Sequence, residues 1–472
     1  MTVPFALLLL GLPPILPTAA PCIRPTRAGT QVQGETRICP GRYRIADPAE
    51  RGVIIAASSG TRIDLTGVVL ESGDSVPARF TGIGIASRGV DGVVITGGAV
   101  RGYRFGVRLE GGRAHRVSGI DASGSRATEL RSTPERADST DRLDLRHREV
   151  LDRYGWGVLL VGTTGASVTR VTARGAQNGI GLLEARDSYL ADNDISLNSG
   201  WGIHLWRSSG NIITRNRADR TRRCQAPPAD CGAAAVVLRE QSDSNTIVDN
   251  DLTGSSIGFL MTGEPAPARP SVGNVVHRND ASHALVCAFS AAFAWNTTFL
   301  ENRVDSARTG FRLDRLTASL LRANTVIGAR DAAITLTHGS DDAIEANLLL
   351  GGKVGIRVSA PDSGGPPSRG HRIDDNMVGN VEEGIVLSGT TGSRLRGNVL
   401  DEVGDALVLD GPGHGTEVTG NVFLRTSGWF IAAPDLAAGG NYWATPDASA
   451  AAARVRGRIS VLPWRPASAA GY

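Results

Sequence analysis

The stretch GWGIHLWRSSGNIITRN, residues 200–216, decides the fold. It contains a short alternating apolar run, a polar corner, and a second apolar run that ends in asparagine. The apolar runs are only four to six residues long and alternate with a period of two, which predicts strands rather than helices. In the first run we expect Ile203 and Leu205 to point inward and His204 and Trp206 to point outward.

The same phrase recurs along most of the chain. NGIGLLEARDSYLADN ends at Asn193, and AVVLREQSDSNTIVDN ends at Asn250. Successive asparagines are 22 or 23 positions apart, or 29 or 34 where a loop is inserted. A fixed period in this range is typical of a solenoid. The recurring asparagines are Asn193, Asn216, Asn250, Asn279, Asn302, Asn324, Asn347, Asn376, Asn398 and Asn421.

The period has a simple physical interpretation. Three short strands and three turns use about 22 residues, so each repeat makes one coil, and coils stack at the ~4.8 Å spacing of paired strands. An asparagine that recurs at one corner can bond its amide to the same residue above and below, as in an Asn ladder. One coil cannot bury its apolar face, whereas about 12–15 stacked coils can. We therefore expect one all-β solenoid of parallel strands.

Composition narrows the class of protein. The 59 glycines and the aromatic content of 5% suit tight corners and slim strands. The net charge of +3 is close to balance, so a nucleic-acid partner is not expected. Lys353 is the only lysine, which makes a lysine base a poor candidate. Arginine is abundant and well suited to binding carboxylates.

The N-terminus predicts export. Residues 1–20 form an apolar run that ends in small side chains, which is typical of a secretory signal, although no basic residue precedes it. The alternative is an ordinary buried N-terminal segment. No other run is long enough to span a bilayer. We expect a secreted or periplasmic bacterial protein.

The five cysteines agree with export. Cys22 and Cys39 bracket a short loop, and Cys224 and Cys231 bracket a loop inserted between two coils. Both pairs are expected to form disulfides in an oxidising compartment. The second pair could instead hold a metal ion, but neither a further cysteine pair nor a histidine cluster accompanies it. Cys287 is expected to be a small buried apolar residue.

The repeats divide the chain into segments. We expect an N-terminal cap, a β-helix and a C-terminal cap or tail after the signal, at residues 21–56, 57–445 and 446–472. A densely charged insertion at residues 126–154 breaks the period. It is either a solvated insertion or a wall beside a groove, because long loops on solenoids often shape the binding face.

The phrases WGIHLWRSSGNIITRN, AVVLREQSDSNTIVDN, GFLMTG and GNYW carry a resemblance to known proteins. Over roughly residues 60–445 the chain resembles the pectin-lyase-like superfamily of right-handed parallel β-helix proteins. It looks most like the bacterial branch with NosD-type and carbohydrate-binding and sugar-hydrolysis (CASH) repeats. The resemblance implies the right-handed fold. It leaves the activity open, because that superfamily includes lyases, hydrolases, epimerases, adhesins and a periplasmic protein linked to copper-site assembly.

Outward side chains of a parallel sheet form columns along the solenoid axis. Alignment of the coils on the Gly-Ile-x-Leu phrase gives three columns: Gly181, His204 and Val237; Leu183, Trp206 and Arg239; and Glu184, Arg207 and Glu240. Two carboxylates two coils apart have backbones ~10 Å apart, near the upper separation used by inverting glycosidases.

We interpret these columns as a candidate catalytic set of Glu184, His204, Arg207, Arg239 and Glu240. His204 is the candidate general base, and Arg239 is suited to hold a uronate carboxylate. The alternative for the charged column is a surface ion-pair ladder. The alternative for His204 is an exposed strand residue.

The substrate contacts are expected next to this set. Trp201 and Trp206 could stack on a sugar ring, and Arg312 and Asp314 continue the same face further along the chain. The alternative for the two tryptophans is packing under the charged insertion.

These observations favour a protein that binds polysaccharide on its outer parallel face, with lyase, epimerase or hydrolase activity as an open question. The competing hypotheses are a structural or adhesive solenoid and a periplasmic metal-site assembly factor. Calcium could bind at Asp341-Asp342 or Asp374-Asp375, but paired aspartates at turns are usually solvated corners. With 3 methionines and 8 scattered histidines, support for copper is thin. We expect no cofactor and a monomer.

Overall fold

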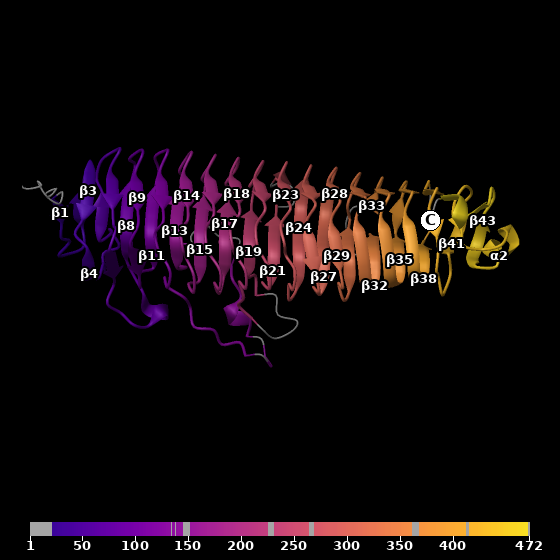
Figure 1. Cartoon of the computed structure of the whole chain (residues 1–472), viewed down its shortest axis with the longest axis horizontal. Coiled ribbons are helices and arrows are strands. Elements are labelled where there is room, and N and C mark those ends of the chain that lie inside the picture. The colour runs from indigo at the N-terminus through magenta and orange to yellow at the C-terminus, as the bar shows by residue number, and fades with distance from the viewer. Residues whose placement is uncertain are drawn as a thin grey trace, which may run out of the picture.

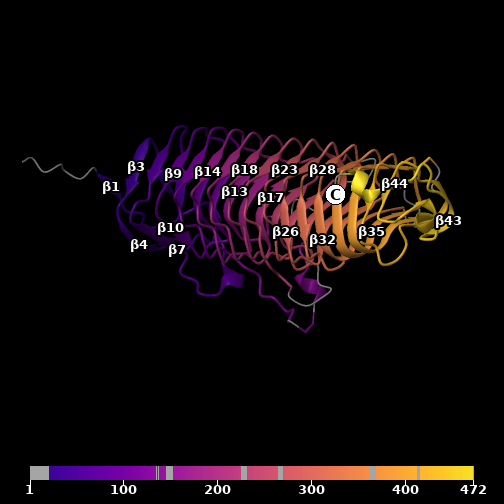
Figure 2. The ribbon, with the colours of Figure 1, turned by 45° about the vertical axis from the view of Figure 1, so that its right-hand side comes forward.

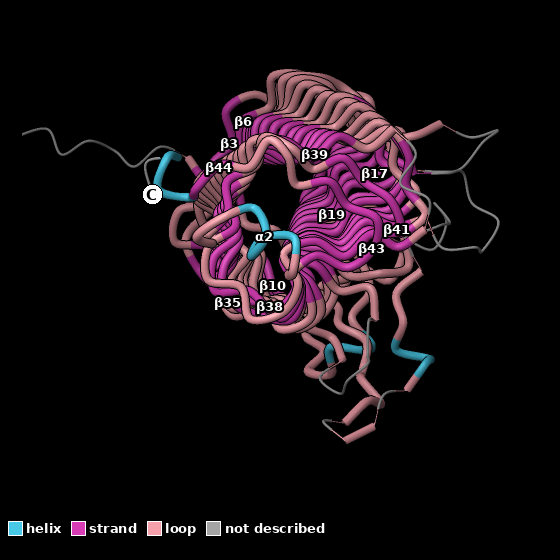
Figure 3. Tube along the Cα trace, turned by 90° about the vertical axis from the view of Figure 1, so that its right-hand side faces the viewer, coloured by secondary structure: helices cyan, strands magenta, loops and turns pink. Residues whose placement is uncertain are grey.

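The computed structural model describes residues 21–133, 135–136, 138–144, 152–224, 231–263, 269–360, 368–411 and 415–470. They form a long rod in which the chain advances from one end to the other, coil by coil (Figure 1). Seen along its axis, the rod is a closed ring of strands around an interior (Figure 3). The fold is a right-handed parallel β-helix, as predicted. The expected signal, residues 1–20, lies outside the described residues.

Sheet A runs the length of the rod and holds sixteen short parallel strands, about one per coil. The sequence predicted about 12–15 coils, and the stack is slightly longer because residues 22–56 already wind as coils. The strands are β1 (Cys22–Ile23), β3 (Glu35–Ile38), β6 (Arg62–Asp64), β9 (Val94–Thr96), β12 (Arg116–Ser118), β14 (Ser167–Thr169), β16 (Tyr189–Ala191), β18 (Ile212–Thr214), β20 (Thr246–Val248), β23 (Val275–His277), β25 (Thr298–Leu300), β28 (Leu320–Arg322), β31 (Ala343–Glu345), β34 (Arg372–Asp374), β37 (Arg394–Arg396) and β39 (Glu417–Thr419).

Sheet B carries the Gly-Ile-x-Leu phrases. Its strands also pair in parallel from one coil to the next along the rod. They are β2 (Thr30–Val32), β5 (Ile54–Ala56), β8 (Ile83–Arg88), β11 (Phe105–Glu110), β13 (Trp156–Val161), β15 (Asn178–Leu183), β17 (Trp201–Trp206), β19 (Ala234–Arg239), β21 (Ile257–Thr262), β24 (Cys287–Trp295), β27 (Thr309–Thr317), β30 (Ala332–Thr337), the second parts of β32 (Leu348–Ser359), β35 (Met377–Ser388) and β38 (Val399–Asp410), and β41 (Ile431–Ala437) and β43 (Val455–Ser460).

Sheet C closes the ring. In the middle coils single parallel bridges replace its strands, and three long strands bend from sheet C into sheet B near the C-terminus. Its strands are β4 (Gly41–Arg44), β7 (Val68–Glu71), β10 (Ala99–Arg101), β26 (Arg303–Asp305), β29 (Thr325–Ile327), the first parts of β32, β35 and β38, β40 (Val422–Phe423), β42 (Tyr442–Trp443) and β44 (Arg465–Pro466).

Few elements lie outside these sheets. They are the strand pieces β33 (Ser368–Arg369) and β36 (Thr390–Thr391), the 3₁₀ turns η1 (Pro77–Arg79), η2 (Ser139–Asp141) and η3 (Ala467–Ala470), and the helix α2 (Ala448–Ala452). The strand piece β22 (Ser271–Val272) pairs with the end of β24 in sheet B. The short helix α2 is rich in alanine, and Asp447 caps it by accepting the backbone N–H of Ala450. None of the described helices is long and apolar enough to cross a membrane.

The interior of the rod is a continuous apolar core. Ile203 and Leu205 are fully buried in it, which confirms the predicted alternation of β17. Aromatic rings stack across coils; the rings of Phe289 and Phe311, for example, lie 4.8 Å apart. Because every coil contributes inward side chains to the same core, neighbouring coils stabilise one another through burial of apolar surface.

The predicted asparagine ladder exists over its whole length. The side-chain N–H of each ladder residue donates to the Oδ1 of the next, from Asn193 to Asn421, at 2.8–3.1 Å. The ladder continues to Asn441, which the sequence analysis missed because its spacing falls to 20 residues. Each Oδ1 also accepts the backbone N–H of the preceding member. At this corner an asparagine side chain, and not a paired strand, therefore accepts the backbone N–H of each ladder residue.

The ladder also explains the backbone at this corner. The residue before each ladder asparagine has a positive φ, between 49° and 80°. Most of these residues are not glycine, and a left-handed conformation costs them about 1–2 kcal/mol each. The hydrogen bonds of the adjacent asparagine hold this turn in place, so the strained residue and the ladder residue form one unit.

Both predicted disulfides are present. Cys22 bonds to Cys39, and Cys224 bonds to Cys231. Cys287 is buried and takes part in neither disulfide, as predicted. The charged insertion projects from the N-terminal half of the rod, at the corner between sheets C and B (Figures 1 and 2).

Candidate functional site

The predicted columns exist on the outer face of sheet B. In the strand register His204 lies between Gly181 and Val237, and Trp206 lies between Leu183 and Arg239. The column that contains His204 continues toward the C-terminus. Its later members are Arg312, Thr335, Arg357, Val386, Val408, Ala432 and Arg456. The alignment of coils read from the sequence is therefore confirmed.

His204 points outward from the coil but is fully buried. Its ring lies 4.3 Å from the ring of Trp201 and 6.0 Å from that of Trp156. Neither ring nitrogen has a hydrogen-bond partner among the described residues. Burial, with a smaller contribution from Arg239, lowers the pKa of His204 to about 3. The histidine is thus a neutral packing residue at neutral pH, unlike the general base or the exposed strand residue considered from the sequence.

Trp201 and Trp206 are both buried, and Trp201 lies under the charged insertion. The ring of Trp201 meets Tyr154 of the insertion edge-on at 5.4 Å, and its indole N–H donates to the carbonyl of Gly232 at 2.8 Å. Trp206 is also buried. Trp201 therefore packs under the insertion, which is the alternative considered from the sequence. Neither tryptophan ring is exposed to solvent, so neither can stack on a sugar ring.

The charged column forms one ion pair rather than a three-residue ladder. The guanidinium of Arg207 lies 2.9 Å from the carboxylate of Glu240 and stacks over the ring of Trp206 at 4.3 Å. Glu240 and Arg239 are each only 7% exposed. Glu184 is exposed and forms no ion pair with any described residue. Of the five candidate catalytic residues, His204, Arg239 and Glu240 are therefore buried, whereas Glu184 and Arg207 are exposed.

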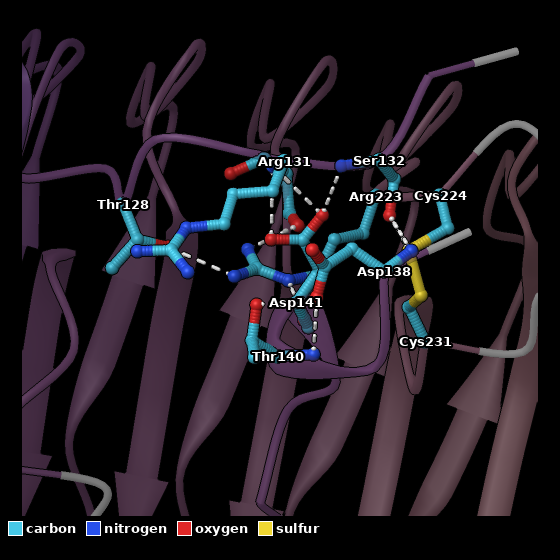
Figure 4. The surroundings of a disulfide bond; sticks show 10 residues. Thr128, Arg131, Ser132, Asp138, Thr140, Asp141, Arg223, Cys224 and Cys231 are labelled. Atoms are coloured by element: carbon cyan, nitrogen blue, oxygen red, sulfur yellow. Dashed lines mark hydrogen bonds between the residues drawn. A yellow bond between two sulfur atoms is a disulfide. The ribbon is translucent and has the colours of Figure 1, made fainter. Parts of the chain in front are cut away.

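A clamp holds the insertion against the rod (Figure 4). Arg223 donates to the carbonyl of Asp141, to the hydroxyl of Thr128 at 2.8 Å, and to the carbonyl of Ser199 at 3.2 Å. The carboxylate of Asp141 accepts the backbone N–H of Ser132 at 2.7 Å. The described part of the insertion is thereby tied to the coil that precedes the Cys224–Cys231 loop.

The disulfide loop adds further contacts to the clamp. The hydroxyl of Ser132 lies 3.3 Å from the sulfur of Cys224, and the backbone N–H of Leu143 donates to the carbonyl of Cys231 at 3.0 Å. Leu143 joins a second apolar cluster, which lies on the outer face of sheet B and extends from Ile83 to Cys287. We call this covered stretch the closed half of the face.

The remainder of the outer face, from β27 to β43, is the open half. Arg312 is exposed here and Asp314 is half-buried, so these two predicted substrate-binding residues lie on accessible surface. Asp314 forms an ion pair with Arg315, whose guanidinium lies over the ring of Phe293. The structure thus separates Arg312 and Asp314 from the other predicted site residues.

A groove of about 640 Å³ crosses the open half. Its floor is apolar and includes Val386 and Val408. Arg357 and Glu383 form an ion pair at 2.8 Å along one side, each with its side chain partly exposed. Arg456 lies at the far end and forms no ion pair with any described residue. The groove therefore offers an uncommitted cation, hydrogen-bonding carboxylates and an apolar floor.

Sequence reasoning missed this groove although its signal was present. Arg357 in β32 and Arg456 in β43 lie in the same column of outward side chains as His204. The prediction from the sequence followed this face only as far as Arg312 and Asp314. Extension of the same alignment to the last coils would have found both arginines.

A Ser-His-Asp arrangement lies elsewhere, inside the rod. Ser368 Oγ is 2.8 Å from His371 Nε2, and His371 Nδ1 is 3.7 Å from Asp342 Oδ2. Burial raises the pKa of Asp342 to about 7 and lowers that of His371 to about 4. All three residues are at most 1% exposed, so a substrate has no access to them. The cluster continues an inner polar ladder in which the backbone N–H of Ser319 donates to Asp342, and it is structural.

The described residues do not fit a metal centre. They contain no group of three or more His, Cys, Asp or Glu side chains that could hold an ion. The cysteines of both pairs are oxidised, and His204 is enclosed by tryptophans. The aspartates considered for calcium have other roles, because Asp374 pairs with Arg394 and Asp342 is buried.

The sequence signature of one family matches most of the chain. It is described as periplasmic copper-binding protein (NosD), and it covers residues 54–265 and 268–448. No curated protein matches.

Solved structures with a similar fold are distant in sequence. The Dettilon tailspike protein is 14% identical over 75% of this chain and 61% of its own, with a TM-score of 0.45. PfbA, a surface adhesin of Streptococcus pneumoniae, is 11% identical over 84% and 83%, with a TM-score of 0.44. The periplasmic alginate epimerase AlgG is 14% identical over 80% and 84%, with a TM-score of 0.42.

Proposed function

We propose that this chain, which belongs to the family of periplasmic copper-binding proteins called NosD, binds an acidic polysaccharide in the groove of its open half. The protein is secreted or periplasmic, in keeping with its family and its two disulfides. Polysaccharides are accessible to a protein of this compartment, and the groove supplies the chemistry to recognise one.

The main support for this proposal is the change in solvent exposure along the column that contains His204. Its members are enclosed at His204 and become accessible at Arg357 and Arg456. From β32 to β43 the groove spans four strand spacings, or about 19 Å along the axis. A groove of this length that follows the axis suits an extended polymer better than a compact ligand.

The lining indicates which kind of polymer. Arg456 has no ion-pair partner among the described residues and is free to bind a carboxylate in the bidentate manner of a guanidinium. Glu383 and Asp410 can accept hydrogen bonds from hydroxyl groups. Val386 and Val408 offer apolar surface to the C–H face of a sugar ring. Together these groups match a chain of hydroxylated rings that carry carboxylates.

We propose binding without turnover. The candidate base His204 is enclosed and neutral, and the carboxylate of Glu240 is buried and paired with Arg207. We assign no copper chemistry to this chain, because its described residues hold no suitable group of ligands. The metal-site assembly hypothesis would regain support if copper titration of the full chain gave a stoichiometric, tight site.

The test is a binding assay with the mature protein on a set of acidic and neutral polysaccharides. We expect binding to acidic polymers only, and a loss of about tenfold or more in affinity for Arg456→Ala, which removes a charge-assisted hydrogen bond. Arg215→Ala is the matched control, since Arg215 is an exposed, ion-paired arginine near sheet A. His204→Ala and Glu240→Ala should leave glycan binding unchanged.

Two results would contradict the proposal. One is the absence of binding to every acidic polymer, which would favour a structural solenoid. The other is an equal loss of affinity in Arg456→Ala and Arg215→Ala, which would mean non-specific attraction to positive charge. Release of unsaturated sugar products, followed by ultraviolet absorbance, would show turnover and overturn the assignment of binding alone.

A further inference from the structure

A separate cavity of about 500 Å³ lies near the N-terminal end of the rod. It is bounded by the loop that follows β7 and by the corners of the first coils of sheet C. Its volume falls in the range of small-molecule sites. Its lining residues lie between positions 44 and 175, whereas the groove of the open half is lined by residues 357–457. The two sites therefore occupy different parts of the rod (Figure 1).

Among the described residues, one arginine of this cavity has no ion-pair partner. Three of the charged lining residues already have partners: Glu71 pairs with Arg42, Asp74 with Arg79, and Arg101 with Asp121. Arg44 is exposed and forms no ion pair with any residue that the structure describes. An uncommitted guanidinium beside three neutralised pairs favours an anionic ligand.

The aliphatic stem of Arg44 lies close to Gly73 of the next coil. Gly73 has a φ of +95°, and a Cβ at this position would lie 3.0 Å from Cγ and 3.2 Å from Cδ of Arg44. The loop can pass against the aliphatic stem of Arg44 only because residue 73 lacks a side chain. The stem is thereby packed while the guanidinium remains at the cavity.

Part of the lining of this cavity is apolar. Phe80 and Pro77 line the cavity, and the ring of Phe80 lies beside Gly102. The hydroxyl of Ser72 donates to the carbonyl of Gly102, which ties the loop to the next coil. A fixed aromatic ring next to a cation suits a ligand that has both a ring face and a negative charge.

The carboxylates of Glu71 and Asp74 complete the recognition chemistry. One oxygen of Glu71 accepts Arg42 at 2.7 Å, and one oxygen of Asp74 accepts the backbone N–H of Val76 at 2.9 Å. Each carboxylate has remaining lone pairs that can accept hydroxyl donors. A ligand with several hydroxyl groups would satisfy them, whereas a bare anion would be repelled by them.

We propose that this cavity binds a sugar acid of one or two rings. The carboxylate of the ligand lies on Arg44, one face of a ring lies against Phe80, and hydroxyl groups donate to Asp74 and Glu71. This site does not depend on the groove of the open half, and either site can exist without the other.

The experiment is calorimetric titration of the full chain with glucuronate and galacturonate, and with glucose, acetate and inorganic phosphate as comparison probes. We expect a sugar acid to bind at least about tenfold more tightly than any comparison probe. Arg44→Ala should lower that affinity by about tenfold or more. Gly73→Ala should weaken it as well, because the added Cβ displaces the stem of Arg44. Arg113→Ala is the matched control, since Arg113 is exposed and paired with Asp91 outside the cavity.

Several outcomes would overturn the proposal. They are equal binding of glucose and the sugar acids, tighter binding of phosphate than of the sugar acids, no binding of either sugar acid, and unchanged affinity in Arg44→Ala. Arg44→Ala should leave polysaccharide binding by the groove intact, and Arg456→Ala should leave sugar-acid binding intact. Failure of one site is thereby distinguished from failure of the other.

Discussion

Substitution of Asn324 by alanine tests the asparagine ladder at its centre. The side-chain N–H groups of Asn324 donate to Asn347 Oδ1 and to the carbonyl of Phe299, both at 3.0 Å. Its Oδ1 accepts the backbone N–H of Asn302 at 2.9 Å and the side-chain N–H of the same residue at 3.0 Å. Alanine removes all four hydrogen bonds and leaves the buried backbone N–H of Asn302 without its acceptor.

The expected loss of stability follows from these contacts. A typical hydrogen bond contributes about 1 kcal/mol net, and a buried donor without a partner costs about 1–3 kcal/mol. Asn324→Ala should therefore lower the free energy of unfolding by about 3–6 kcal/mol. Urea denaturation followed by circular dichroism measures it, and hydrogen exchange of the coils on either side locates it. Arg322→Ala, an exposed change in β28 of the same coil, should alter stability by about 0.5 kcal/mol or less.

Asn324→Asp separates hydrogen bonding from shape. Aspartate keeps an acceptor for Asn302 but, when ionised, it places a buried negative charge against the oxygens of Asn347 and Phe299. Its pKa in the folded state should be raised, so the loss of stability relative to wild type should be smaller below about pH 4 than at pH 7, opposite to the usual behaviour of a paired carboxylate. A loss below about 1 kcal/mol in Asn324→Ala, with no dependence on pH in Asn324→Asp, would refute the reasoning.

The closed half gives the remaining predictions. The pKa of His204 is lowered to about 3 from an ordinary value of 6.5, so the unfolded chain binds more protons between these values and folding weakens as the pH falls below 6.5. The stability difference between wild type and His204→Phe should therefore change by about 2 kcal/mol between pH 6.5 and pH 5, and a constant difference in melting experiments would contradict this account. Arg223→Ala should release the insertion, so that limited proteolysis cuts it faster and iodide quenches the fluorescence of Trp201 more strongly. The control Arg217→Ala should change neither measurement. Unchanged cleavage and quenching in Arg223→Ala would show that the clamp does not hold the insertion.

The fold and much of the site geometry could be predicted because the period fixes the register. Once the ladder asparagines are aligned, the side-chain period of two decides which residues face the core, and a slip of one residue would invert them. The strand register therefore confirms the predicted neighbours of His204 and Trp206 in the columns. The ladder at Asn441 was missed because the last coil is shorter.

The burial of the closed half could not be predicted in the same way. It depends on the insertion, which has no period and whose contacts are set by single residues such as Arg223 and Leu143. A weaker signal was nevertheless present. The outward column positions Leu183, Val237 and Leu260 are apolar, and apolar side chains repeated on an outer face indicate that something covers it.

Footprinting of arginines tests most directly that ligand binding belongs to the open half. The full chain is labelled with an arginine-selective glyoxal reagent, with and without a bound acidic polysaccharide, and mass spectrometry reports the reactivity of each guanidinium. We expect Arg357 and Arg456 to become protected while Arg207 and Arg215 keep their reactivity. Protection of Arg207 with unchanged Arg357 and Arg456 would place the ligand on the closed half and contradict the account.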